Sequence, residues 1–154
     1  MAQRSFEQSI SIAAAPAQVA PFFASYDQHT ALHPLIVAIR PIAAQPAAPD
    51  ARWYAITDRM QLGPLRFRFT YTAALRDAGD GAFISDAFQF PRVHLHNVTR
   101  CQPAGSGTHV HEQITIDAPR LLIGYVYQQA FAAHRELLAR LKQHIEAAQG
   151  AGMV

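Results

Sequence analysis

The sequence predicts an α+β fold: a seven-stranded antiparallel sheet that curves around one long C-terminal helix, with two short helices after the first strand. Seven segments have the alternating pattern of half-buried strands, most are joined by short turn sequences, and after Pro119 the apolar residues recur with a helical period. The 154 residues are a usual length for one domain. We therefore expect a single domain over residues 1–154, with an ordered core over about residues 5–147.

The N-terminal part predicts one strand and two helices. Residues Ser5–Ile12 place Phe6, Ile10 and Ile12 on one face, as in a half-buried strand. An Ala-rich helix is expected over Pro16–Ala24, because proline suits the first helical turn. A second short helix is expected over Asp27–His33, since Pro34 would stop it.

The middle of the chain predicts a meander of six strands. They are Ile36–Ile42, Arg52–Met60, Leu65–Leu75, Ala82–Phe90, Val93–Cys101 and Thr108–Asp117. All but the first connection have hairpin length and turn chemistry, such as Gly63-Pro64 and the Gly-rich segment before Thr108. A helix of about 25 residues follows, with a stripe that runs from Ile123 to Ile145.

Composition excludes several classes of protein. Half of the residues are hydrophobic and 16% are charged, which favours a globular fold over disorder. The net charge of +2 is small and no basic run exists, so we do not expect nucleic acid as a partner. With the single cysteine Cys101 and no apolar stretch of membrane-spanning length, we expect a cytoplasmic protein without stable membrane insertion. A homodimer remains an open alternative.

The order of elements resembles the helix-grip superfamily, which includes START lipid-transfer domains, birch-pollen allergen-like proteins and bacterial polyketide cyclase or dehydrase-like proteins. Bacterial ligand-binding members are similar in the second half of the chain, at Val93-His94-Leu95-His96, Gly107-Thr108, Glu112, Asp117-Ala118-Pro119, Phe131 and Arg135. The resemblance implies an internal cavity for a small apolar molecule that is lipid-like, aromatic or polyketide-like. It also implies, as an alternative, a cyclase, dehydratase or isomerase without a cofactor.

The turns predict which side chains face this cavity. A two-residue turn at Pro91-Arg92 would set Phe90 opposite Val93 and would place Asp86 and Phe88 on the inner face. The predicted ligand-binding residues are Phe67, Phe69, Tyr71, Asp86, Phe88, Leu95, Asn97, Glu112, Ile114 and Tyr127. Trp53 and Tyr54 lie on a strand whose register the turns do not fix, so either one is a candidate for the inner face. The two short helices, with Phe22, Phe23, Tyr26 and Leu35, would close one end of the cavity as a gate.

Tyr71, Asp86, Asn97 and Glu112 would form one polar row across four strands in an otherwise apolar wall. Buried carboxylates need partners, so the row is either a satisfied polar network, or solvated at a rim, or a site that orients a polar group of the ligand. In an enzyme, Asp86 or Glu112 would be the general base and Tyr71 a proton donor. No cofactor motif accompanies them.

Four histidines on neighbouring strands, His94, His96, His109 and His111, share the outer face. His96 and His111 would be diagonal neighbours, which makes them candidate metal ligands. Arg66, Arg68 and Arg100 share the same face, and their charge disfavours a cation. We therefore expect no physiological metal, and interpret the histidines as surface residues or as part of a face that binds a partner chain.

Overall fold

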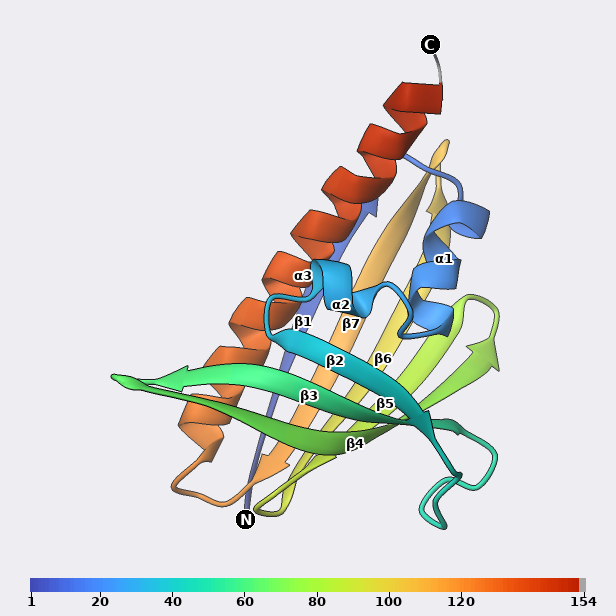
Figure 1. The fold of residues 1–154 in the computed structure, drawn as a ribbon. Helices are drawn as coiled ribbons and strands as arrows, with labels where there is room; N and C mark the ends of the chain where they lie inside the picture. Colours follow the sequence, from blue (N-terminus) through green and yellow to red (C-terminus); the bar gives the residue numbers. More distant parts are fainter. Residues whose placement is uncertain (153–154) are drawn as a thin grey trace.

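The computed structural model describes residues 1–152 and confirms the predicted fold (Figure 1). The elements are β1 (Ala2–Ile12), α1 (Pro16–Ala24), α2 (His29–Leu32), β2 (Ile36–Ile42), β3 (Arg52–Leu62), β4 (Leu65–Gly79), β5 (Ala82–Gln89), β6 (Val93–Ala104), β7 (Gly107–Ala118) and α3 (Ile123–Gly152). Among the described residues, no helix is long and apolar enough to cross a bilayer.

The seven strands form one antiparallel sheet in the order β1-β7-β6-β5-β4-β3-β2. Strands β2 to β7 follow one another as a meander, and β1 closes the row by pairing with β7. The sheet curves around α3, which runs along its concave side, while α1 and α2 lie over the same side near the middle of the helix (Figure 1). The interior of the molecule therefore lies in the space between the sheet and the helices.

The hydrophobic core fills one part of this space. Val19, Phe22 and Phe23 of α1 pack with Leu137 and Leu141 of α3, and with inward-facing strand residues such as Ile12 and Val110. A second cluster joins Phe6, Ile114 and Ile116 to the first half of α3. Both clusters anchor the helix to β1 and β7, the strands at one edge of the sheet.

Most element boundaries agree with the sequence prediction, and the differences have local causes. Several strands extend beyond their predicted ends because the ladder continues into the turns; β3 and β4, for example, pair as far as Leu62 and Leu65. The second helix is shorter than predicted, since His33, which precedes Pro34, is extended with φ −73° and ψ 129°.

The register of β5 differs from the prediction by one residue. Gln89, not Phe90, pairs with Val93, so the turn between β5 and β6 has three residues and contains Arg92 in the left-handed region at φ 59°. A one-residue slip turns every side chain of a strand to the other face. Phe83, Ser85, Ala87 and Gln89 consequently face inward, and the prediction that Asp86 and Phe88 do so is wrong.

Candidate functional site

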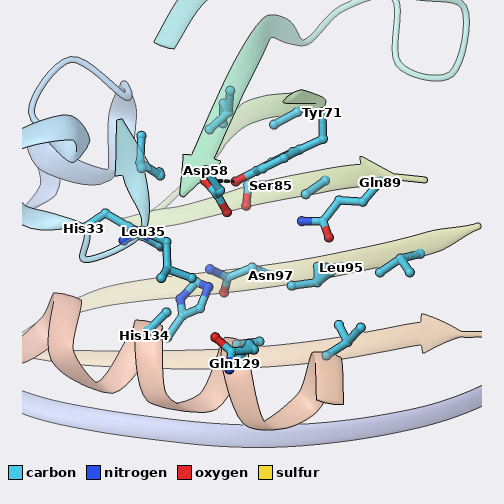
Figure 2. A pocket seen from close by; sticks show the side chains of 18 of the residues that line it. His33, Leu35, Asp58, Tyr71, Ser85, Gln89, Leu95, Asn97, Gln129 and His134 are labelled. Atoms are coloured by element: carbon cyan, nitrogen blue, oxygen red, sulfur yellow. Dashed lines mark hydrogen bonds between the residues drawn. The ribbon is translucent and has the colours of Figure 1, made fainter. Parts of the chain in front are cut away.

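A cavity of about 680 Å³ lies between the sheet, the short helices and α3. Its wall is mostly apolar, with Phe67 and Phe69 from β4, Leu95 from β6, Ile114 from β7 and Leu137 from α3. A volume of this size is typical of sites for small organic molecules. Figure 2 shows polar side chains that project into it from opposite sides, Asp58 and Tyr71 from the sheet and His134 and Gln129 from α3.

Seven of the ten predicted ligand-binding residues line this cavity: Phe67, Phe69, Tyr71, Leu95, Asn97, Glu112 and Ile114. On β4, β6 and β7, the strands that carry these residues, the side chains that point inward are the ones that the sequence predicted. For β6 and β7 the pairing is displaced by two residues, with Asn97 opposite Ile114 and Thr99 opposite Glu112, and an even displacement leaves inward residues inward.

The other three predicted residues lie elsewhere. Asp86 and Phe88 are on the outer face of β5, for the register reason given above. The ring of Tyr127 packs edge-on against Phe6 with centroids 5.5 Å apart, and the Arg4 guanidinium lies 3.7 Å from its centre. Tyr127 is thus part of the contact between α3 and β1, and the predicted polar row through Asp86 is wrong.

A charged cluster surrounds Glu112, whose side chain is 1% exposed. One of its oxygens, Oε2, accepts a hydrogen bond from Asn97 Nδ2 at 2.8 Å and lies 3.1 Å from His134 Nδ1. Burial opposes ionisation of this carboxyl, but the charge of His134 and the two hydrogen bonds outweigh it and hold the pKa of Glu112 below its usual value. The arrangement favours a carboxylate anion in the wall of the cavity.

A second polar pair joins Asp58 of β3 to Tyr71 of β4, and Figure 2 shows it across the cavity from His134. The Tyr71 hydroxyl donates to Asp58 Oδ1 at 3.3 Å. Burial raises the pKa of Asp58 to about 6, although the hydrogen bond from Tyr71 opposes the rise. Burial also raises the pKa of Tyr71 well above its usual value. Asp58 therefore exchanges its proton close to neutral pH, while Tyr71 remains a donor.

The short helical segment contributes two neutral imidazoles, His29 and His33. Burial lowers the pKa of His29 to about 3 and that of His33 well below its usual value. Within residues 1–152, three buried polar atoms that belong to cavity-lining residues have no hydrogen-bond partner: His29 Nδ1, Glu112 Oε1 and the Tyr125 hydroxyl. Unpartnered buried polar groups are costly and therefore uncommon.

One end of the cavity carries exposed apolar side chains from three separate turns. Phe90 is 94% exposed and Leu121 98% exposed, and Leu62 at the β3–β4 turn is 52% exposed. All three line the cavity. The cavity therefore has apolar side chains that are exposed to solvent at three turns.

Sequence reasoning missed several residues of this cavity. Asp58 shares an alternating set with Tyr54, Ile56 and Met60, and a carboxylate within such an apolar set was a detectable signal. The register of β3 places Tyr54 on the inner face, where it packs on Tyr26, while Trp53 faces outward. Ser85 and Gln89 were missed because the predicted register of β5 turned their side chains to the outer face, whereas they line the cavity.

The outer-face histidines also differ from the prediction. His96 lies opposite Thr115 and His111 opposite Arg100, so the candidate pair of His96 and His111 is not formed. His94 and His96 instead gather at Asp86. The predicted gate residues Phe23, Tyr26 and Leu35 do line the cavity, whereas Phe22 stacks on His29 at a centroid distance of 4.3 Å.

A curved antiparallel sheet wrapped around a C-terminal helix, with a cavity between the two, defines a helix-grip protein. The sequence profile of the family described as "Polyketide cyclase / dehydrase and lipid transport" matches residues 3–146, and the chain belongs to this family. A comparison with curated proteins finds no match.

Solved structures with the same fold are distant in sequence. Ara h 8.0201 has a TM-score of 0.72 and 14% identity over 95% of this chain and 99% of its own. A START superfamily protein from Mycobacterium smegmatis has a TM-score of 0.74 and 12% identity over 94% and 98%. The di-domain ARO/CYC StfQ from the steffimycin biosynthetic pathway has a TM-score of 0.76 and 12% identity over 96% of this chain and 52% of its own. These likenesses establish the fold.

Proposed function

We propose that the protein binds a small, largely apolar molecule that carries at least one polar group, in the cavity between the sheet and α3. The observation that supports this proposal best is the unpartnered polar atoms of His29, Glu112 and Tyr125 in a mostly apolar wall. A ligand with a hydroxyl or carbonyl group would satisfy such atoms, while its apolar part would cover the Phe-rich strands. The family description, which includes lipid transport, supports the same class of ligand.

Native mass spectrometry of freshly purified protein, followed by thermal-shift assays with fatty acids, aromatic compounds and polyketide-like compounds, tests the proposal. We expect a co-purified small molecule or an increase of Tm with at least one of these classes. A matched pair of variants locates the site. Ala133 lines the cavity and its neighbour Ala132 is exposed, so Ala133→Phe should abolish the stabilisation and Ala132→Phe should retain it.

Stabilisation that survives in Ala133→Phe would place the ligand outside this cavity and contradict the proposal. Because a large side chain at a buried position risks misfolding, Ala87→Phe on β5 provides a second way to fill the cavity from the opposite wall. The absence of both a co-purified species and any stabilisation across the panel would also count against binding.

The Asp58–Tyr71 pair favours a second candidate function, acid–base catalysis without a cofactor in the same cavity. A carboxyl with a pKa of about 6 is suited to accept a proton from a ligand, and once Asp58 is protonated the Tyr71 hydroxyl can turn from it and donate its one hydrogen bond to a developing oxyanion. Such a pair supports a cyclase, dehydratase or isomerase. In this function Asp58 takes the role that the sequence suggested for Asp86, which lies on the outer face.

The two functions are distinguished by Asp58→Asn, assayed with whichever compound stabilises the wild-type protein. An enzyme would convert that compound, and the variant would lose turnover by a factor of about 100 or more while it still bound the compound. A binding protein would leave the compound chemically unchanged in both forms, as followed by mass spectrometry of the small-molecule fraction.

A further inference from the structure

A cluster of two histidines and one carboxylate lies on the outer face of the sheet, on the far side from the cavity. Asp86 Oδ1 lies 2.8 Å from His94 Nε2 and 2.8 Å from His96 Nδ1. The three ligand atoms all lie within 4.8 Å of one another. One carboxylate oxygen thus serves two imidazoles, and the three groups converge on a single point.

The strand ladder holds the three side chains in this arrangement. His94 and His96 are two residues apart on β6 and therefore share a face, and Asp86 is the direct partner of His96 on β5. The ring of Phe88 stacks on His94, with centroids 4.8 Å apart and planes within 4°, and Trp53 stacks in turn on Phe88. These contacts restrict rotation of the His94 ring.

The geometry is close to that of three ligands on a zinc-type ion. Tetrahedral ligands about 2.0 to 2.1 Å from zinc are about 3.3 Å apart, so the two N–O distances of 2.8 Å would need to widen by only about 0.5 Å. A cation would take the lone pair of His94 Nε2 and leave the proton on Nδ1, which lies 4.0 Å from Asp117 Oδ2. A carboxylate that accepts a hydrogen bond from a histidine ligand is the usual outer partner in such sites, and Asp117 would need to approach His94 by about 1 Å to take this role.

The charges nearest the cluster are two carboxylates and one arginine, Arg76, which pairs with Ile84 and is a diagonal neighbour of Asp86 on the same face. Asp86 and Asp117 supply two carboxylates, and the residues that pair with Asp86 on either side are Ala74 and His96. Arg100 lies four residues beyond His96 on β6, about 13 Å away along the strand. Arg66 and Arg68 pair with Gln61 and Arg59 near the β3–β4 turn. The arginines that disfavoured a metal in the sequence are therefore at the far ends of the strands.

We propose that Asp86, His94 and His96 form a binding site for a divalent transition-metal ion of the zinc type on the outer face of the sheet. The side chains of His94 and His96 are 35% and 39% exposed, so water can occupy the remaining coordination position. This site is separate from the cavity and does not depend on the proposed ligand binding.

Equilibrium dialysis of the whole chain against Zn²⁺, with metal and protein quantified afterwards, tests the site, and Co²⁺ provides a spectroscopic readout through its visible absorption bands. We expect one ion per chain. Asp86→Asn, His94→Gln and His96→Gln should each weaken binding by about 100-fold or more, and Asp117→Asn by about 10-fold. The control is the double variant His109→Gln/His111→Gln, which removes two histidines from the same outer face and should retain the wild-type affinity.

The proposal is overturned if the wild-type chain binds less than one equivalent of Zn²⁺ and Co²⁺, or if the control variant loses as much affinity as the three ligand variants. The latter result would indicate general binding to surface histidines. A comparison of Tm without metal identifies any variant that has lost its fold, and the three ligand variants must agree with one another for the site to stand.

Discussion

Glu112 and Asp58 are both buried carboxyl groups in the wall of one cavity, yet their pKa values shift in opposite directions. Glu112 is 1% exposed and its pKa is lowered; Asp58 is 5% exposed and its pKa is raised to about 6. Their burial is nearly the same. The difference lies in their partners, since Glu112 has His134 and Asn97, while Asp58 has the Tyr71 hydroxyl at 3.3 Å.

This difference assigns the two groups to different tasks. A carboxylate that is paired with an imidazole and an amide, and whose pKa is lowered, keeps its charge at neutral pH and can orient a polar ligand, but it is a poor proton acceptor. A carboxyl whose desolvation is only partly offset exchanges its proton near neutral pH, which is what a general base requires. Any acid–base chemistry in this cavity should therefore depend on Asp58 rather than on Glu112.

The largest effect is expected from His134→Leu, which removes the imidazole partner of Glu112. The variant leaves a carboxylate that is 1% exposed without this partner, and breaking a buried pair in this way costs about 4 kcal/mol. We expect urea denaturation at pH 7 to show a loss of that size in the free energy of unfolding. The pKa of Glu112 should rise at the same time, since its main stabilising charge is gone.

The double variant Glu112→Gln/His134→Leu is the control, because it carries no buried charge at this position. We expect it to be more stable than His134→Leu alone, which gives a favourable coupling energy between the two residues. If the two single-variant effects simply add in the double variant, the imidazole does not stabilise Glu112, and the comparison with Asp58 loses its basis.

The next effect concerns the dependence of stability on pH. Because the folded-state pKa of Asp58 is about 6 and its ordinary value is 3.8, the folded chain holds this proton more tightly than the unfolded chain. The contribution of Asp58 to stability is complete below pH 4 and is lost as the pH rises through about 6, a difference of about 3 kcal/mol. Asp58→Asn should be more stable than the wild-type protein at pH 8 by an amount of this order, and similar to it at pH 4.

Urea denaturation of both proteins at several pH values between 4 and 8 measures this difference. Asp50→Asn is a matched control, since Asp50 is an exposed carboxylate that does not line the cavity. If the stabilities of the wild-type protein and of Asp58→Asn change in parallel over this range, Asp58 ionises normally. The acid–base function would then lose its main support.

The sequence predicted the fold and most of the cavity because both depend on patterns that span many residues. Alternation fixes which face of β4, β6 and β7 points inward, and a displacement of two residues between β6 and β7 left Asn97 and Glu112 in place. The turn between β5 and β6 was more sensitive. One additional residue in that turn moved Asp86 to the outer face, where it meets His94 and His96.

The sequence placed Asn97 near Glu112, but the contacts of Glu112 with His134 and of Asp58 with Tyr71 were beyond sequence reasoning for a different reason. His134 appeared as one more member of the helical stripe, and its contact with Glu112 depends on how α3 is rotated and placed across the sheet. Asp58 lies on a strand whose connection to β2 is long and whose register the turns did not fix. Contacts across such distances are set by packing rather than by local pattern.

A third prediction separates the hydrogen bonds from the charges. Asn97→Leu removes the amide that donates to Glu112 Oε2 at 2.8 Å, and the loss of a hydrogen bond to a buried charge costs about 2 kcal/mol. The free energy of unfolding at pH 7 should fall by that amount, with a smaller loss at a pH acidic enough to protonate Glu112. An equal loss at both pH values would indicate a packing effect, and Leu95→Asn, a polar substitution at the neighbouring inward position, should lack this pH dependence.

The smallest effect is expected at the corresponding bond of Asp58. Tyr71→Phe removes a hydroxyl that lies 3.3 Å from Asp58 Oδ1, a longer contact than that of Asn97, so we expect a loss of about 1 kcal/mol at pH 8. Because this bond opposes the effect of burial, the pKa of Asp58 should rise further, by up to about one unit.

Titration of the Asp58 carboxyl carbon by NMR measures this change in pKa directly. Tyr127→Phe, in the contact between α3 and β1, is the matched control. A pKa of Asp58 that falls or stays constant in Tyr71→Phe would show that the hydroxyl does not stabilise the anion, and that burial alone sets the pKa of Asp58.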